Sequence, residues 1–146
     1  TYHYYLLNTR VDDPFLFDTC HRIWPALDLA AMQAAAAQFV GTHDFSALCA
    51  SGSSAAAHGD TVRTITNCTV VQSGDLFTIS VTADGYLYNM VRILAGTLVQ
   101  AGLHKRTPDS IPPLLESRDR KLAGPTLPAK GLFLEKVDYP GLDAIS

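Results

Sequence analysis

The alternation of hydrophobic and polar residues along the chain predicts a small sheet built mainly from antiparallel strands. Residues 63–72 and 76–83 alternate in this way on either side of Ser73-Gly74-Asp75, a combination typical of a β-hairpin. The opening segment, 2–8, is rich in aromatic and aliphatic residues and predicts another strand. A last strand is predicted at 131–138, where Leu residues alternate with other side chains.

A helical repeat of apolar residues predicts a helix over 28–40. Asp28 is a favourable N-cap, and the apolar positions that follow at helical spacing are Met32, Ala35, Ala36 and Phe39. Gly41 stands where a glycine often ends a helix. We therefore interpret His43-Asp44-Phe45 as the turn that follows the helix, with Phe45 packed inward.

A second predicted helix, 88–103, is apolar around most of its circumference, which is typical of a buried helix. Gly96 near its centre costs about 1 kcal/mol of helix propensity relative to Ala, so we expect another backbone to pass close by. A short third helix is predicted after Ser110, with two prolines in its first turn, and 51–59 is predicted to be a loop. The order of elements predicts an α+β fold, with a largely antiparallel sheet and helices packed on one face.

Composition fits one globular domain and narrows the class of protein. The chain has 146 residues, of which 47% are hydrophobic and 17% charged, so it can bury a sizeable core. No apolar run is long enough for a transmembrane helix, so we expect no membrane partner. Cys20, Cys49 and Cys68 are odd in number and widely spaced, which favours a reducing, cytoplasmic setting. Their spacing with the histidines fits no common zinc-ligand pattern.

The net charge of −3 does not by itself suggest a nucleic-acid partner. Residues 104–121 nevertheless form a mild basic cluster that comprises Lys105, Arg106, Arg118, Arg120 and Lys121. Because acidic side chains are interspersed among them, we interpret the cluster first as a solvated surface. Contacts to RNA phosphates are the alternative.

Arg92 is the most informative single residue because it lies in the middle of the apolar helix at 88–103. A guanidinium keeps its charge, so it must reach solvent or find an anionic partner. Its helical neighbours at i−4 and i+4 are Tyr88 and Gly96, and neither is a carboxylate. Arg92 is thus either a snorkelling side chain or an arginine that lines a cleft and meets a carboxylate or phosphate.

Two further readings concern the first strand and the histidines. Strand alternation puts Tyr2 and Tyr4 on one face, where they are either ordinary strand aromatics or rings that face a cleft and can stack on a nucleobase. A hydrolase would need His43 or His58 to work with Asp44 or Asp60. Motifs for serine hydrolases, phosphate-binding loops and zinc proteases do not occur, so hydrolysis is a remote alternative.

Several separated segments, in this order, closely resemble the C-terminal half of the bacterial tRNA pseudouridine synthase A family, from Tyr2 to about Pro140. The segments that carry the resemblance are Gly-Thr-His-Asp-Phe-Ser at 41–46, Thr-Val-Arg-Thr-Ile at 61–65, Gly-Tyr-Leu-Tyr-Asn-Met-Val-Arg-Ile-Leu-Ala-Gly-Thr-Leu at 85–98, Asp-Arg at 119–120, Ala-Gly-Pro-Thr at 123–126, Pro-Ala-Lys-Gly-Leu-Phe-Leu at 128–134, and Val-Asp-Tyr at 137–139.

The resemblance implies a specific chemistry. The family isomerises uridine to pseudouridine in the anticodon stem-loop of tRNA, as a homodimer and with neither cofactor nor metal. A catalytic aspartate attacks a target nucleotide that has been flipped out of its stack. The matching residues imply that Tyr2 packs against the target base, that Arg92 pairs with the catalytic aspartate, and that Leu132 lines the pocket. On the same resemblance, Tyr88, Asn89 and Arg63 are assigned to substrate binding.

One departure from the family pattern concerns the nucleophile. The family carries it in an Arg-Thr-Asp-Ala-Gly type of motif in the N-terminal half, and no such motif occurs in this sequence. We therefore expect residues 1–146 to be a C-terminal domain that is inactive alone, because a covalent mechanism fails without its nucleophile. The alternative is a non-catalytic RNA-binding or dimerisation module of the same fold.

Overall fold

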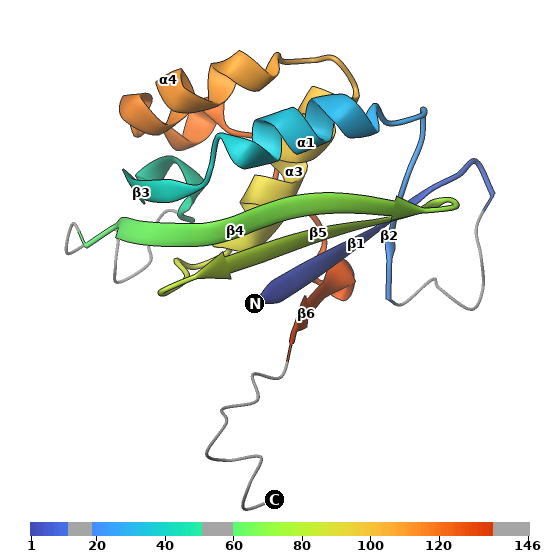
Figure 1. Ribbon diagram of the computed structural model, residues 1–146, viewed down its shortest axis with the longest axis horizontal. Coiled ribbons are helices and arrows are strands. Elements are labelled where there is room, and N and C mark those ends of the chain that lie inside the picture. The colour runs from blue at the N-terminus through green and yellow to red at the C-terminus, as the bar shows by residue number, and fades with distance from the viewer. Residues whose placement is uncertain (12–18, 51–59, 136–146) are drawn as a thin grey trace, which may run out of the picture.

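The computed structural model of the protein describes residues 1–11, 19–50 and 60–135. Its strands form one sheet, and the labelled helices lie on one face of that sheet (Figure 1). The strands are β1 (Tyr2–Asn8), β2 (His21–Ile23), β3 (Gly41–Asp44), β4 (Val62–Ser73), β5 (Leu76–Ala83) and β6 (Leu132–Leu134). The α-helices are α1 (Leu29–Ala37), α3 (Met90–Gly102) and α4 (Ile111–Ser117).

The sheet has the strand order β2-β1-β5-β4-β3, and β6 also pairs with β1. Only the β1–β2 pair is parallel among the described strands. The predicted hairpin is confirmed, because β4 and β5 pair in register from Ser73 opposite Leu76. The predicted α+β fold, with a largely antiparallel sheet and helices on one face, is likewise confirmed.

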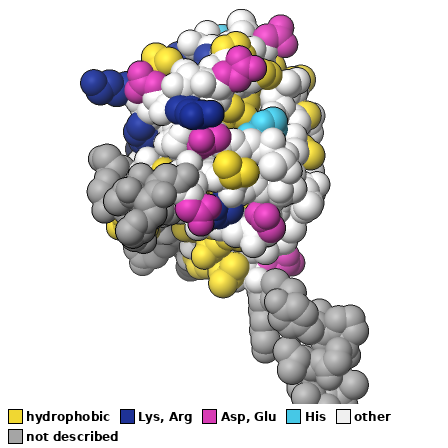
Figure 2. All heavy atoms as spheres, turned by 90° about the vertical axis from the view of Figure 1, so that its left-hand side faces the viewer, with side chains coloured by type: hydrophobic (Ala, Val, Ile, Leu, Met, Phe, Trp, Pro, Cys, Tyr) yellow, Lys and Arg dark blue, Asp and Glu magenta, His cyan; other side chains and the backbone are white. Residues whose placement is uncertain are grey.

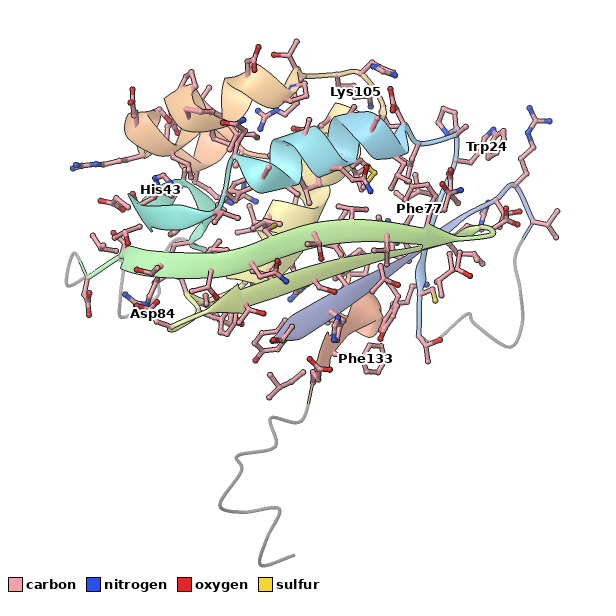
Figure 3. All side chains as sticks on the ribbon, in the orientation of Figure 1. Trp24, His43, Phe77, Asp84, Lys105 and Phe133 are labelled. Carbon is pink, nitrogen blue, oxygen red and sulfur yellow. The ribbon has the colours of Figure 1, made fainter. Side chains whose placement is uncertain are left out.

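The core lies between the sheet and α1 and α3. Alternation along β5 directs Phe77, Ile79 and Val81 to the helix-covered face, where all three side chains are buried. In Figure 3, Phe77 lies between the sheet and α1, whereas Phe133 lies on the other side of the sheet. The core face of α1 consists of Met32, Ala35 and Ala36, and each is fully buried. Phe39, the fourth apolar residue predicted from helical spacing, is also fully buried but lies just beyond the end of the helix.

The end of α1 differs from the prediction. Asp28 caps the helix as expected, and its carboxylate accepts a hydrogen bond from the Ala31 amide at 3.1 Å. The helix ends at Ala37, however, and the predicted turn at 43–45 is wrong because β3 begins at Gly41 and pairs with β4. In the folded sheet, the edge of β4 offers unpaired backbone hydrogen-bonding groups to residues 41–44. Pairing with that edge outweighs the local tendency of these residues to form a turn. Phe45 is fully buried, as predicted.

Other element boundaries also shift. Helix α3 begins at Met90 rather than at Tyr88. Helix α4 follows Ser110 as expected, with its prolines in the first turn, but Ser110 does not cap it: the serine hydroxyl donates to the Thr107 carbonyl at 2.6 Å. Strand β6 is described only as far as Leu134. Most of the remainder of that predicted strand, and the predicted loop at 51–59, lie outside the described residues.

Gly96 permits the close backbone approach that its place in α3 predicted. A Cβ atom at this position would lie 1.9 Å from the carbonyl oxygen of Pro125. The crossing is fixed by Thr97, whose hydroxyl oxygen accepts a hydrogen bond from the Gly124 amide at 3.0 Å. The segment 123–131, which leads from α4 to β6, is thereby pressed against α3.

Candidate active site

A cleft of about 350 Å³ opens where β1, β6 and the N-terminal end of α3 meet. Segment 123–131 borders it, because the backbone that crosses Gly96 continues along α3 towards β6. The cleft brings together most of the site residues expected from the sequence, and its lining comprises Tyr2, Tyr86, Leu87, Tyr88, Asn89, Met90, Val91, Arg92, Ala129 and Leu132.

The Arg92 side chain is partly buried and held at two of its three nitrogens. Nε donates to the carbonyl of Leu127 at 2.7 Å, and Nη1 donates to Oδ1 of Asn89 at 3.0 Å. The Leu127 amide in turn donates to the Arg92 carbonyl at 3.3 Å, so the two backbones are tied directly. Within the described residues, Nη2 has no hydrogen-bond partner and Arg92 forms no ion pair. The guanidinium therefore has one edge available for an acceptor outside these contacts.

The ring of Tyr2 is oriented by Tyr86, a residue that the sequence analysis did not single out. The two rings meet edge to face, with centroids 4.7 Å apart and planes at 87°. The Tyr86 hydroxyl donates to the Val81 carbonyl at 2.9 Å and accepts from the Ala83 amide at 3.1 Å. Burial raises the pKa of Tyr86, so the phenol stays a neutral donor. Because the partners of this hydroxyl are backbone groups, residue spacing gave no signal for it.

Leu132 lies in the cleft because the chain before it packs tightly on Tyr4. The Tyr4 hydroxyl donates to the Pro128 carbonyl at 2.6 Å. A Cβ atom at Gly131 would lie 2.8 Å from Cζ of Tyr4, so only glycine fits without a shift. Burial raises the pKa of Tyr4, and the positive charge of Arg92 offsets part of that rise.

The two remaining predicted site residues differ in their placement. Tyr88 lines the cleft with 65% of its surface exposed, so its ring can reach a bound molecule. Arg63 is not among the residues that line the cleft. Its Nη1 donates to the Val62 carbonyl at 2.8 Å and lies 3.4 Å from a carboxylate oxygen of Asp60.

Comparison with known proteins places this arrangement in a family. A family model described as tRNA pseudouridine synthase matches residues 35–140. The chain belongs to this family.

The relatives are longer than the chain. It is 44% identical over 138 residues to tRNA pseudouridine synthase A of Acetivibrio thermocellus, covering 94% of this chain and 55% of the relative. It is 42% identical over 139 residues to tRNA pseudouridine synthase A 2 of Clostridium tetani, covering 95% of this chain and 55% of the relative. It is 44% identical over 138 residues to tRNA pseudouridine synthase A of Moorella thermoacetica, covering 94% of this chain and 55% of the relative. The chain thus spans about half the length of these curated relatives.

For a pseudouridine synthase the basic cluster at 104–121 is a natural candidate for RNA contact, but each of its arginines makes at least one contact within this chain. Arg118 lies 3.4 Å from the Asp44 carboxylate, and Arg106 donates to the Leu122 carbonyl. Arg120 donates to the Gly124 carbonyl at 2.9 Å. On the side that carries α4 and β3, Figure 2 shows Lys and Arg interspersed with Asp and Glu. Arg118 and Arg120 thus bind a neighbouring acid and a loop, which favours the solvated-surface interpretation for these two residues, whereas Nε and Nη1 of Arg106 are buried without a hydrogen-bond partner among the described residues.

The remaining sequence candidates form no second site in the described part of the chain. His43 and Asp44 do not bond to each other: the imidazole Nε2 lies 3.3 Å from the Val40 carbonyl oxygen, and the carboxylate accepts from the Thr61 hydroxyl at 2.7 Å. The three cysteines are buried and form no disulfide with one another. The described residues contain no group of three or more potential metal ligands, and none of their helices is long and apolar enough to cross a membrane.

Proposed function

We propose that this chain forms one side of a tRNA pseudouridine synthase active site, with Arg92 as the catalytic residue that pairs with the nucleophilic aspartate. The chemistry breaks the bond between N1 of uracil and C1′ of the ribose and joins C5 of the base to C1′. The aspartate would come from a segment preceding this chain in a longer protein, since its family motif does not occur here.

The observation that carries the proposal is that Arg92 has no counter-charge among its described hydrogen-bond partners. A partly buried guanidinium whose described partners are an amide oxygen and a backbone carbonyl has no counter-charge among them. Partial burial makes a carboxylate a favourable partner, because a charge-assisted hydrogen bond is about twice as strong as a neutral one. The edge with Nη2 is available for that carboxylate.

The other cleft residues fit the binding of a flipped base. The ring of Tyr2 packs perpendicular to that of Tyr86, which restricts its orientation, and we propose that it stacks on uracil. Leu132 provides an apolar wall, and Tyr88 and Asn89 line the rest of the cleft. Arg63, which lies outside the cleft, is proposed to contact the RNA beyond the target base. The substrate is tRNA, and we expect the longer protein to act as a cytoplasmic homodimer.

The test measures tritium release from tRNA that carries uridine tritiated at C5, because the isomerisation frees that hydrogen. This chain is assayed alone and after fusion to the N-terminal half of the Acetivibrio thermocellus relative. We expect no release by the chain alone and release by the fusion. In the fusion, R92K should lower kcat about 100-fold or more, because Lys keeps the charge but loses the planar fork. The matched control is R118K, which alters an exposed arginine that pairs with Asp44 on a different surface.

The outcomes separate the proposal from its alternative. Release by the chain alone would refute the split site and point to a carboxylate such as Asp60 or Asp84 as nucleophile. Tight, salt-sensitive tRNA binding with no release by chain or fusion would favour the RNA-binding module instead. If R92K and R118K release tritium equally fast in the fusion, Arg92 has no catalytic role.

A further inference from the structure

Asn89, which precedes the first residue of α3, has a backbone conformation unusual for its position. Its φ is +61° and its ψ is +11°, in the left-handed region, where Asn is tolerated better than most residues. A residue that caps a helix usually has extended φ and ψ, so that its side chain reaches the free amides of the first turn. Asn89 makes no such capping bond. The position that most favours an Asn cap is thus occupied by an Asn that does not cap.

The side chain of Asn89 instead forms a hydrogen bond with Arg92. Its Oδ1 accepts the hydrogen bond from Nη1 at 3.0 Å, and the i, i+3 spacing on the helix makes this contact possible. The second acceptor, the Leu127 carbonyl, is fixed because its own amide bonds back to Arg92 and the segment before it is pressed on Gly96. A guanidinium is planar and rigid, so two fixed nitrogens determine where the third points.

We propose that Asn89 is a positioning residue, whose amide oxygen and the Leu127 carbonyl together clamp Arg92 so that Nη2 faces the anion it must meet. The inference rests on the proposed function, since that function makes Arg92 catalytic. It changes the role of Asn89 from contact with the base to control of the arginine. A neutral amide suits this role, because it accepts the hydrogen bond without neutralising the guanidinium.

The decisive variant is N89G, because glycine adopts a φ of +61° without strain. If Asn89 were needed only for its left-handed backbone conformation, N89G would leave the fold and the activity intact. If Asn89 positions Arg92, N89G keeps the fold but frees the guanidinium. The matched control is H104G: His104 has a φ of +60°, and its exposed side chain meets Asp28 rather than the cleft.

The first measurement is on this chain itself, by NMR of the arginine side-chain nitrogens. Rotation about the Nε–Cζ bond of Arg92 should be slow in the parent chain, unchanged in H104G and faster in N89G. Unchanged rotation in N89G would overturn the clamp, and this result is independent of any catalytic activity.

The second measurement is the single-turnover rate of tritium release by the fusion. Loss of a hydrogen bond to a charged group should slow N89G about 10-fold with little change in KM. N89D should be slower still, because its carboxylate occupies Arg92 in place of the catalytic aspartate. In an R92K background, N89G should have no further effect, since the two residues act through one contact.

These results separate the two proposals. If R92K is slow but N89G matches H104G, the positioning role is overturned and the proposed function stands. If N89G raises KM alone and adds fully to R92K, Asn89 contacts substrate directly and the positioning role is again overturned. If R92K releases tritium as fast as the parent fusion, the proposed function fails. Asn89 then holds Arg92 without any effect on catalysis.

Discussion

Replacing Gly96 by Ala should destabilise this protein, although Ala is the better helix former. In an exposed helix the exchange would stabilise by about 1 kcal/mol. Here the added Cβ would lie 1.9 Å from the carbonyl oxygen of Pro125 and 3.0 Å from its carbonyl carbon. The obstacle is backbone, so it cannot move aside by a side-chain rotation.

The size of the effect follows from the contacts that must be broken. Overpacking costs about 1–3 kcal/mol, and a rigid obstacle belongs at the upper end of that range. Moving Pro125 away also stretches the hydrogen bond from the Gly124 amide to the Thr97 hydroxyl, a contribution of about 1 kcal/mol. After the gain in helix propensity is allowed for, we expect G96A to lose about 3 kcal/mol of unfolding free energy.

Urea denaturation of this chain measures that loss directly. The matched control is G102A on the same helix, where the nearest atoms are Cγ and Sδ of Met32, each 2.9 Å away in a flexible side chain. Because Met32 can change its rotamer, we expect G102A to lose about 1 kcal/mol or less. If G96A is as stable as the parent chain, or loses no more than G102A, the close backbone crossing does not exist as described.

Three further predictions use the same chain. Burial opposes ionisation of Asp44, yet hydrogen bonds from Thr61 and Ser46 and the charge of Arg118 lower its pKa overall, so its contribution to stability is present above its unfolded pKa near 4 and is lost as pH falls through the lower folded pKa. D44N should therefore destabilise the chain at pH 7, and its deficit relative to the parent should shrink as pH falls below about 4, as measured by urea titrations across that range. Burial raises the pKa of Cys68 to about 12, so this thiol should resist iodoacetamide in the native chain and react on unfolding, as peptide mass spectrometry will show; rapid native labelling would contradict its burial. G131A should lose about 1–3 kcal/mol of stability in urea, because its Cβ would lie 2.9 Å from the Tyr5 carbonyl oxygen; parent-like stability would mean that this packing is loose.

The local elements were predictable where a short-range pattern coincides with the tertiary environment. The β4–β5 hairpin follows from alternation and its Ser-Gly-Asp turn, and the core face of α1 follows from helical spacing. The turn predicted at 43–45 failed because β3 exists only through pairing with β4, a contact between residues distant in sequence. Edge strands with weak local patterns, such as β2, were missed for the same reason.

The sequence by itself determined the family and the residue types of the candidate site, because the motifs at 85–98 and 128–134 are recognisable without any structure. It also showed that Arg92 needs a partner, since a guanidinium cannot lose its charge in a helix that is otherwise apolar. Only the tertiary structure decided which atoms hold that arginine. The Leu127 carbonyl is a backbone group, and every residue has one, so no side-chain pattern could identify it. The left-handed conformation that turns Asn89 towards Arg92 likewise depends on how the chain enters α3. The cleft itself arises because β1, β6 and α3, which are distant in sequence, meet in one place.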